Sequence, residues 1–229
     1  MRKPRNRDIY AGALLGNLQL AQTRALLPML QRCAGSHGLL LCAGGGEAPP
    51  ALPLLSHWTQ MRVDGERYGG DLIGATDEPL AFVDDAFDLV WLRHALEVVG
   101  GFSEVLQEAA RVLAPGGTLV VSGMHPFSAW APWYYWQQRG TGHSLHAPSR
   151  LAYRLHRAGM NVTSMRRVGC SWPRATDGPT RAHQPAGGGY VLIAQKQRSL
   201  VTPLRLRAGS RHVPANGRLS PSARGRITA

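Results

Sequence analysis

Apolar residues in this chain fall into short runs that are separated by glycine, proline and polar residues. Unbroken apolar runs flanked by glycines are typical of strands in a parallel sheet that is covered on both faces. The pattern predicts strands at residues 39–42, 57–63, 68–75, 87–92, 118–122, 161–168 and 190–195. Apolar positions at helical spacing predict helices at residues 11–30, 103–113 and 149–158, the second capped by Ser103. Strands that alternate with helices indicate an α/β fold with a doubly wound, mostly parallel sheet.

The connection between the second and third predicted strands is shortened. It consists of Asp64, Gly65, Glu66 and Arg67, and Asp-Gly is a signal for a tight turn. A parallel crossover needs a dozen or more residues, usually with a helix. We therefore expect these two strands to form a hairpin, which makes one edge of the sheet antiparallel.

Residues 38–46 (GLLLCAGGG) combine a buried strand with three consecutive glycines. Glycine adopts positive φ and lets a ligand approach the backbone closely. Strand, glycine turn and helix form the nucleotide site of doubly wound proteins at the carboxyl edge of the sheet. Three glycines in a row also suit a flexible loop, and Pro49, Pro50 and Pro53 allow only a short helix after them.

Three downstream stretches have a specific order and spacing: residues 80–90 (LAFVDDAFDLV), 94–99 (HALEVV) and 108–122 (EAARVLAPGGTLVVS). They resemble the class I S-adenosylmethionine (SAM) dependent methyltransferases, in particular the type 11 small-methyltransferase group. The resemblance covers residues 36–123 and a last strand near Tyr190. It implies a Rossmann-like methyltransferase fold, SAM as the cofactor and methyl transfer as the activity.

The resemblance also implies a cofactor site at the carboxyl edge of the sheet. The family has an acid before the glycine loop that orients the cofactor, and this chain has Cys42 there. The family's ribose-binding acid has only a loose counterpart, Asp64, so we expect weaker binding than is usual for the family. The positions that correspond to the cofactor site are Cys42, Ala43, Gly44, Gly45, Gly46, Thr76, Asp77 and Leu92.

Two histidines follow predicted strands at this edge: His94 follows the fourth strand and His125 the fifth. Histidine is the usual general base near neutral pH, so both are candidates for taking the proton of a nitrogen or oxygen acceptor. Methyl transfer is an in-line displacement that positioning alone can promote. Both histidines therefore also suit the role of ordinary loop residues.

An aromatic insertion follows the fifth strand, and its role is open between a lid over the acceptor and a small core under a long loop. His143 and His146 lie behind it without an accompanying acid or cysteine. Because zinc normally has three or four protein ligands in total, no metal site is expected. The aromatic residues are Phe127, Trp130, Trp133, Tyr134, Tyr135 and Trp136.

The length of 229 residues and the hydrophobic content of 44% suit one α/β domain with a full core. We expect a basic arm at residues 1–7, a methyltransferase-like domain at 8–198 and a basic, disordered tail at 199–229. Three scattered cysteines do not make a disulfide framework, and neither a secretory signal nor a membrane-spanning run is evident. The expected compartment is the cytoplasm.

The net charge of +12 is unevenly placed, since residues 109–198 contain a single acid, Asp177. Such a basic half, together with the basic tail, suits an anionic acceptor or nucleic acid, although solvation alone also accounts for it. Two functions remain open. The chain is either a methyltransferase acting on an unidentified, small or anionic acceptor, or a binding or scaffold protein on a methyltransferase fold that has lost catalysis. The altered glycine loop and the missing crossover helix favour the second.

Overall fold

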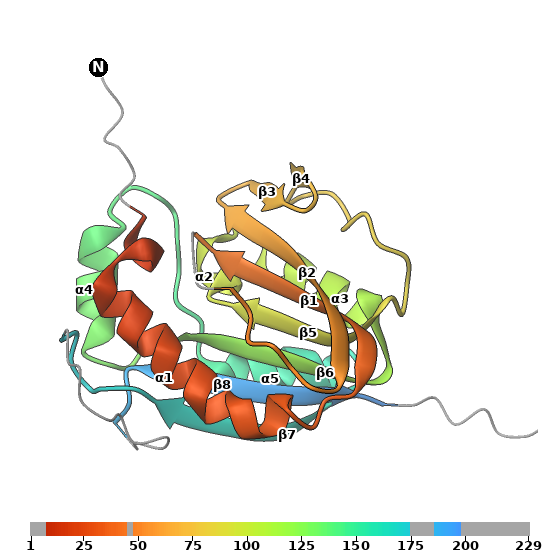
Figure 1. The fold of residues 1–229 in the computed structure, drawn as a ribbon. Coiled ribbons are helices and arrows are strands. Elements are labelled where there is room, and N and C mark those ends of the chain that lie inside the picture. Colours follow the sequence, from red (N-terminus) through yellow and green to blue (C-terminus); the bar gives the residue numbers. More distant parts are fainter. Residues whose placement is uncertain (1–7, 45–47, 175–185, 198–229) are drawn as a thin grey trace, which may run out of the picture. The chain divides into compact units, whose positions relative to one another are not determined.

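The computed structural model describes residues 8–44, 48–174 and 186–197. Their strands form an eight-stranded sheet with the order β4-β3-β2-β1-β5-β6-β8-β7. Helices cover both faces of this sheet (Figure 1). The predicted α/β fold with a mostly parallel central sheet is therefore confirmed. The predicted basic arm and basic tail lie outside the described residues.

The predicted strands and helices are present, most of them longer than the sequence pattern indicated. The strands are β1 (Gly35–Ala43), β2 (Leu55–Asp64), β3 (Arg67–Gly70), β4 (Gly74–Ala75), β5 (Phe87–Arg93), β6 (Leu113–Met124), β7 (Met160–Val168) and β8 (Gly189–Lys196). The helices are a 3-10 turn η1 (Ile9–Ala11), α1 (Ala13–Leu30), α2 (Ala95–Val98), α3 (Phe102–Val112), α4 (Trp130–Gln137) and α5 (Pro148–Arg157). Parallel pairing joins β2, β1, β5 and β6, and antiparallel pairing joins β6, β8 and β7.

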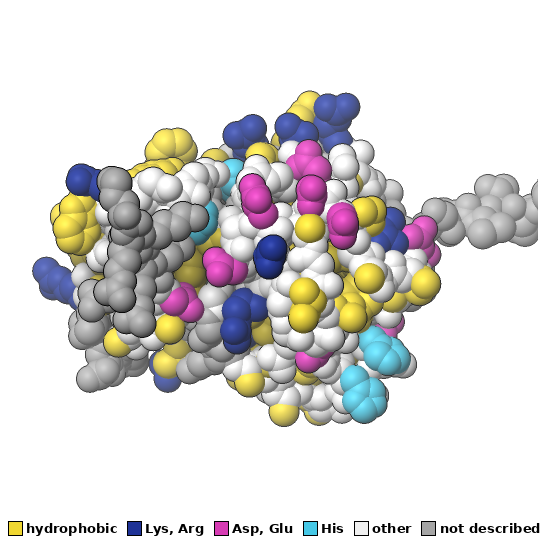
Figure 2. All heavy atoms as spheres, turned by 90° about the horizontal axis from the view of Figure 1, so that it is seen from above, with side chains coloured by type: hydrophobic (Ala, Val, Ile, Leu, Met, Phe, Trp, Pro, Cys, Tyr) yellow, Lys and Arg dark blue, Asp and Glu magenta, His cyan; other side chains and the backbone are white. Residues whose placement is uncertain are grey.

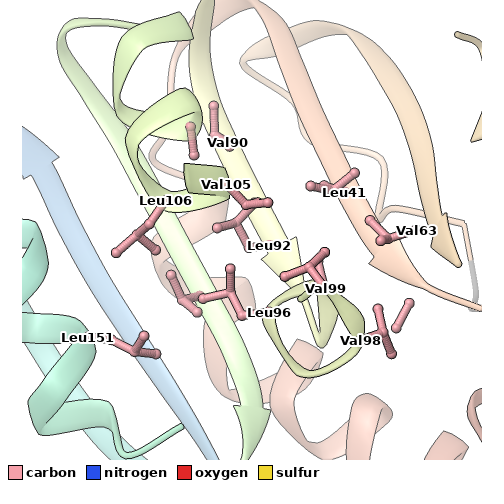
Figure 3. Packing of buried hydrophobic residues seen from close by; sticks show 14 of the residues in the cluster. Leu41, Val63, Val90, Leu92, Leu96, Val98, Val99, Val105, Leu106 and Leu151 are labelled. Carbon is pink, nitrogen blue, oxygen red and sulfur yellow. The ribbon is translucent and has the colours of Figure 1, made fainter. Parts of the chain in front are cut away.

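The central strands β1 and β5 are buried on both faces of the sheet. Leu41 and Leu92 belong to a core that also holds side chains of α2, α3 and α5 (Figure 3). Trp91 faces the other way and packs with Leu26 and Leu30 of α1. Because successive strand residues point to opposite faces, a strand covered on both sides reads as one unbroken apolar run. This is why the pattern predicted these strands well.

The predicted hairpin between the second and third strands is confirmed. β2 and β3 pair antiparallel with Asp64 opposite Arg67, and Gly65 in the turn has a φ of 60°. The predicted third strand is divided into β3 and β4, because Gly70 has a φ of 112° and interrupts the extended chain. The sheet therefore has a small antiparallel edge.

The short helix expected after the glycine turn is absent from residues 48–54, and that prediction was wrong. β1 and β2 are parallel and begin in register, with Gly35 beside Leu55, so the connection must return along the whole of β1. That distance is about 27 Å for a nine-residue strand. Residues 44–54 reach at most about 38 Å when extended but only about 16 Å as a helix. A helix along the whole connection would therefore be too short to cover this distance.

Two of the boundaries that differ from those predicted have a local cause. The helix α3 begins at Phe102 with Gly101 as its N-cap, and Ser103 lies inside the first turn instead of capping it. The carbonyl of Gly101 already accepts the hydrogen bond from the Val105 N–H, which starts the helix two residues early. The strand β6 begins at Leu113 instead of residue 118, because the Pro-Gly-Gly turn is taken up as an irregularity in the pairing with β5.

The Glu-x-x-Arg motif of α3, which consists of Glu108 and Arg111, has a structural role. Arg111 donates hydrogen bonds to the Glu108 carboxylate at 2.8 Å and to the backbone carbonyls of Leu80 and Phe82, both at 2.9 Å. The Glu108 carboxylate also accepts a hydrogen bond from the Leu80 N–H. The Arg111 hydrogen bond lowers the pKa of Glu108. The motif therefore ties the segment before β5 to α3, far from the glycine turn.

The aromatic insertion forms α4, which has one buried and one exposed side. Trp130 and Tyr134 are completely buried, whereas Tyr135 and Trp136 are exposed. The insertion thus contributes to the core, and its outer aromatic side chains remain at the surface. Among the described residues no helix is long and apolar enough to cross a membrane.

Candidate active site

A cavity of about 210 Å³ lies at the carboxyl ends of β1 and β2. Five segments that are distant in sequence meet around it: the residues before α1, the end of β1, the end of β2, the end of α2 and the chain after α4. Parallel strands deliver their carboxyl ends to one edge of a sheet, which is where ligands of doubly wound proteins bind. The polar and glycine residues that line this first cavity include Asp8, Gly44, Arg62, Asp64, Gln138 and His143.

Gly44 is required at its position by the backbone and by its neighbour. Its φ is 61°, a conformation that residues with a Cβ rarely adopt. A Cβ added at Gly44 would also collide with the carboxylate of Asp8. The sequence predicted that another group would come close to the backbone at Gly44. In the structure that group is the side chain of Asp8, from the N-terminal segment. Gly45 and Gly46 lie outside the described residues.

Two polar atoms at the first cavity have no hydrogen-bond partner among the described residues. They are the side-chain oxygen of Gln138, a residue that is 7% exposed, and Nδ1 of His143. Burial lowers the pKa of His143, which keeps its imidazole neutral near neutral pH. A buried polar group without a partner costs about 1–3 kcal/mol. A ligand that hydrogen-bonds to these atoms would recover part of that cost.

A second cavity of about 630 Å³ is lined partly by residues that are close in sequence to those of the first. Asp64 and Val98 line the first cavity, and two residues further along each segment Glu66 and Gly100 line the second. Thr76 and Asp77, which the family resemblance assigns to the cofactor site, also line the second cavity, as do Arg67, Gly101 and Glu104. Figure 2 views the β3–β4 edge and shows several acidic side chains gathered near the centre of this face.

A buried hydrogen-bond network surrounds Glu97, which is 2% exposed. Its carboxylate accepts hydrogen bonds from the backbone N–H of Met124 and from the Tyr10 hydroxyl, the latter at 3.0 Å. Burial, followed by the charge of Glu97, raises the pKa of Tyr10 well above its usual value, so the hydroxyl remains a donor. The network therefore fastens the segment before α1 to the carboxyl ends of β5 and β6.

His94 belongs to this network and is 1% exposed. Its Nδ1 lies 3.0 Å from the Glu97 carboxylate, and its Nε2 lies 2.9 Å from the side-chain oxygen of Gln22. The Gln22 amide nitrogen donates to the Gly123 carbonyl, which orients that oxygen towards His94. Both ring nitrogens thus have partners inside the protein. This placement does not favour the role of proton-accepting base predicted for His94.

His125 follows β6 and is half-buried. Its Nδ1 accepts a hydrogen bond from the backbone N–H of Phe127 at 3.1 Å. Burial, and then the charge of Arg167, lower the pKa of His125, which favours the neutral form that a base requires. His125 does not line either of the two cavities. Its catalytic role remains a prediction.

Three other predicted cofactor residues lie in the core. Ala43 and Leu92 are at most 1% exposed, and Cys42 is 9% exposed. None of the three lines either cavity. Their place at the end of a strand was inferred correctly, but their side chains point into the packed layers. Conversely, sequence reasoning missed Asp8, Gln138 and His143 as lining residues, because no local pattern marks them. Among the described residues there is no group of three metal-ligating side chains.

Comparison with known proteins agrees with this architecture. Residues 55–121, from β2 into β6, match a family described as a methyltransferase domain. A search of curated protein sequences gave no match.

Several solved structures share the fold at low sequence identity. A SAM-dependent methyltransferase from Thermotoga maritima is 14% identical, with a TM-score of 0.56 over 80% of this chain and 91% of that one. A protein described as a methyltransferase from Haloferax volcanii, solved with the methyltransferase activator Trm112, is 16% identical, with a TM-score of 0.56 over 86% of this chain and 100% of that one. A third, from Bacillus halodurans, is 17% identical, with a TM-score of 0.53 over 76% of this chain and 98% of that one.

Residues 55–121 thus match a methyltransferase domain, and the fold of the chain is that of class I SAM-dependent methyltransferases. SAM is the cofactor of this class. The resemblance carried by residues 80–90 and 108–122 is thereby confirmed.

Proposed function

We propose that the two cavities hold SAM and that the chain transfers its methyl group to a small or anionic acceptor. Bound SAM supplies a methyl group on a positively charged sulfur, which a nucleophile can attack directly. The observation that carries the proposal is the first cavity itself. It lies at the carboxyl ends of two parallel strands, and it has a glycine at positive φ. Two polar atoms of its lining residues, on Gln138 and His143, have no hydrogen-bond partner in the described part of the chain.

The residues around the cavities suit the parts of the cofactor. Asp64 ends β2, where the resembled family has the acid that accepts hydrogen bonds from the ribose hydroxyls. The second cavity, lined by Thr76 and Asp77, is the proposed adenine site. A volume of about 210 Å³ in the first cavity is below the roughly 300–1,000 Å³ of most ligand pockets, so the proposal requires both cavities.

The group that takes a proton from the acceptor is proposed to be His125 rather than His94. Both nitrogens of His94 already face acceptors inside the protein, whereas Nδ1 is the only nitrogen of His125 engaged by another described residue. The lowered pKa of His125 favours the neutral imidazole. Positioning of an acceptor that is already nucleophilic would promote the transfer without any base.

The proposal predicts that the intact chain binds SAM, which isothermal titration calorimetry can test. Because Cys42 brings no charge to the glycine turn, we expect a Kd in the micromolar range or weaker, or about −8 kcal/mol at most in magnitude. S-adenosylhomocysteine, the demethylated product, serves as the second ligand. If millimolar SAM gives neither heat nor a thermal shift, the proposal fails and the alternative, a scaffold protein on a methyltransferase fold, gains support.

An anionic partner is favoured by a basic cavity on the outer face of the domain. Ser103 and Gln107 of α3 and Arg154 and Arg157 of α5 line this cavity, which has a volume of about 210 Å³. No described acid lines it. Hydroxyl, amide and guanidinium donors on two neighbouring helices suit a phosphate group. We therefore propose nucleic acid as the partner of the basic half.

If nucleic acid binds at this cavity, association will weaken as the salt concentration rises. Each phosphate contact releases a counterion, so that losing one contact lowers the slope of log K against log salt by about 0.7–0.9. In filter binding, Arg154→Gln should reduce the slope by about this amount. Arg24→Gln, which removes an exposed charge on α1, is the control. Absence of binding even at low salt would remove nucleic acid as a partner.

A further inference from the structure

The end of β1 supplies no charge to the first cavity. Cys42 stands where the resembled family has its acid, and its side chain is buried in the sheet with Sγ 3.5 Å from the Met61 carbonyl. SAM carries an amino-acid portion with an ammonium group and a carboxylate. A buried or half-buried ammonium group requires an acceptor, preferably an anionic one. If the chain binds SAM, another residue must provide that acceptor.

Asp8, in the segment before α1, brings a carboxylate to the end of β1, where Cys42 supplies none. Its carboxylate lies against Gly44, so closely that a Cβ there would overlap it, and it lines the first cavity. The N-terminal segment is held in this place by burial and by a hydrogen bond. Ile9 and Tyr10 are buried, and the Tyr10 hydroxyl donates to Glu97 at 3.0 Å. Asp8 itself accepts a hydrogen bond from the Tyr10 N–H at 3.0 Å.

The first cavity also offers the opposite charge. Arg62, near the end of β2, lines it together with Asp8. An anionic and a cationic side chain in one cavity match the ammonium and the carboxylate of an amino acid. Gln138 lines the same cavity, and its side-chain oxygen, which has no partner among the residues that the structure describes, can accept a further hydrogen bond.

We propose that Asp8 binds the ammonium group of the methionine part of SAM and so replaces the acid that this chain lacks at Cys42. This inference rests on the proposed function, since it concerns the same ligand. It makes the segment before α1 part of the binding site, with Asp8 as a specificity-determining residue for the amino-acid portion. The rest of the cofactor would be held independently, at Asp64 and in the second cavity.

The substitution Asp8→Asn tests this role. Asparagine is as good a helix N-cap as aspartate, so the hydrogen bond from the Tyr10 N–H is retained and only the charge is removed. A charge-assisted hydrogen bond is stronger than a neutral one, and we therefore expect SAM to bind to Asp8→Asn at least about tenfold more weakly than to wild type. The second ligand is 5′-methylthioadenosine, which has the nucleoside but no amino-acid part. Its affinity should stay within about twofold of wild type.

Glu78→Gln is the matched control, because it also removes one negative charge, from an exposed residue that lines neither cavity. Its SAM affinity should equal that of wild type. If wild type does not bind SAM, the proposed function fails and the inference fails with it. If wild type binds but Asp8→Asn binds SAM equally well, the inference alone is overturned. Equal losses for SAM and 5′-methylthioadenosine would also overturn it, because they would indicate a general distortion of the site.

Discussion

Replacing Gly44 by valine will abolish SAM binding and leave the fold intact. The valine side chain would have to occupy the space of the Asp8 carboxylate, which both displaces Asp8 and narrows the first cavity. The φ of 61° adds backbone strain of about 1–2 kcal/mol for any residue with a Cβ. Because Gly44 lies at the edge of the sheet and outside the core, the thermal midpoint should fall by only a few degrees.

The measurement is a SAM titration of wild type and Gly44→Val under identical conditions. Gly159→Val is the matched control, since Gly159 has a φ of 76° but no atom within 4 Å of an added Cβ. It introduces similar strain between α5 and β7 without touching either cavity. We expect this control to bind SAM like wild type. Unchanged binding by Gly44→Val would exclude the first cavity as the cofactor site.

Replacing Glu97 by alanine will strongly lower the free energy of unfolding of the domain. The substitution leaves the Met124 N–H and the Tyr10 hydroxyl without their buried acceptor, and it removes the carboxylate that faces Nδ1 of His94. Breaking a buried, hydrogen-bonded pair by removing one partner costs about 3–5 kcal/mol. For a domain of this size that corresponds to a fall in the thermal midpoint of roughly 10 °C.

Urea unfolding of Glu97→Ala measures this loss. Glu104→Gln is the control, because Glu104 is exposed on α3 and its removal should change the unfolding free energy by less than about 0.5 kcal/mol. The double variant Glu97→Ala/His94→Ala should be less than additive, since the two side chains form one pair. A loss below about 1 kcal/mol for Glu97→Ala would mean that water replaces the carboxylate and that the network does not hold the N-terminal segment.

The sheet was predictable because burial on two faces leaves a signal in the local sequence. The apolar runs at β1, β5 and β6 identified the parallel centre, and the Asp-Gly turn after β2 identified the hairpin. These features depend on residues that are neighbours in the chain. Chain length also bears on the connection between β1 and β2, because a helix over all of residues 44–54 would be shorter than the strand that the connection must cross.

The candidate site was predictable only where a strand ends. Gly44 followed from the glycine turn, and Thr76 and Asp77 followed from the family resemblance. In the structure Thr76 and Asp77 line the second cavity together with Gly100. His94 has the residue type of a base, but its ring lies between Glu97 and Gln22. Residue type and position after a strand do not reveal whether a side chain faces a cavity or the core.

The amino-acid sequence by itself determined the order of strands and helices, the hairpin edge and the glycine turn, because each of these depends on steric and hydrophobic preferences of adjacent residues. Only the tertiary structure decided which side chains surround that turn. Asp8 meets Gly44, and Tyr10 meets Glu97, although 87 residues separate the latter two. Such contacts depend on how the packed layers bring distant segments to one edge of the sheet, and the short-range pattern of a sequence carries no record of them.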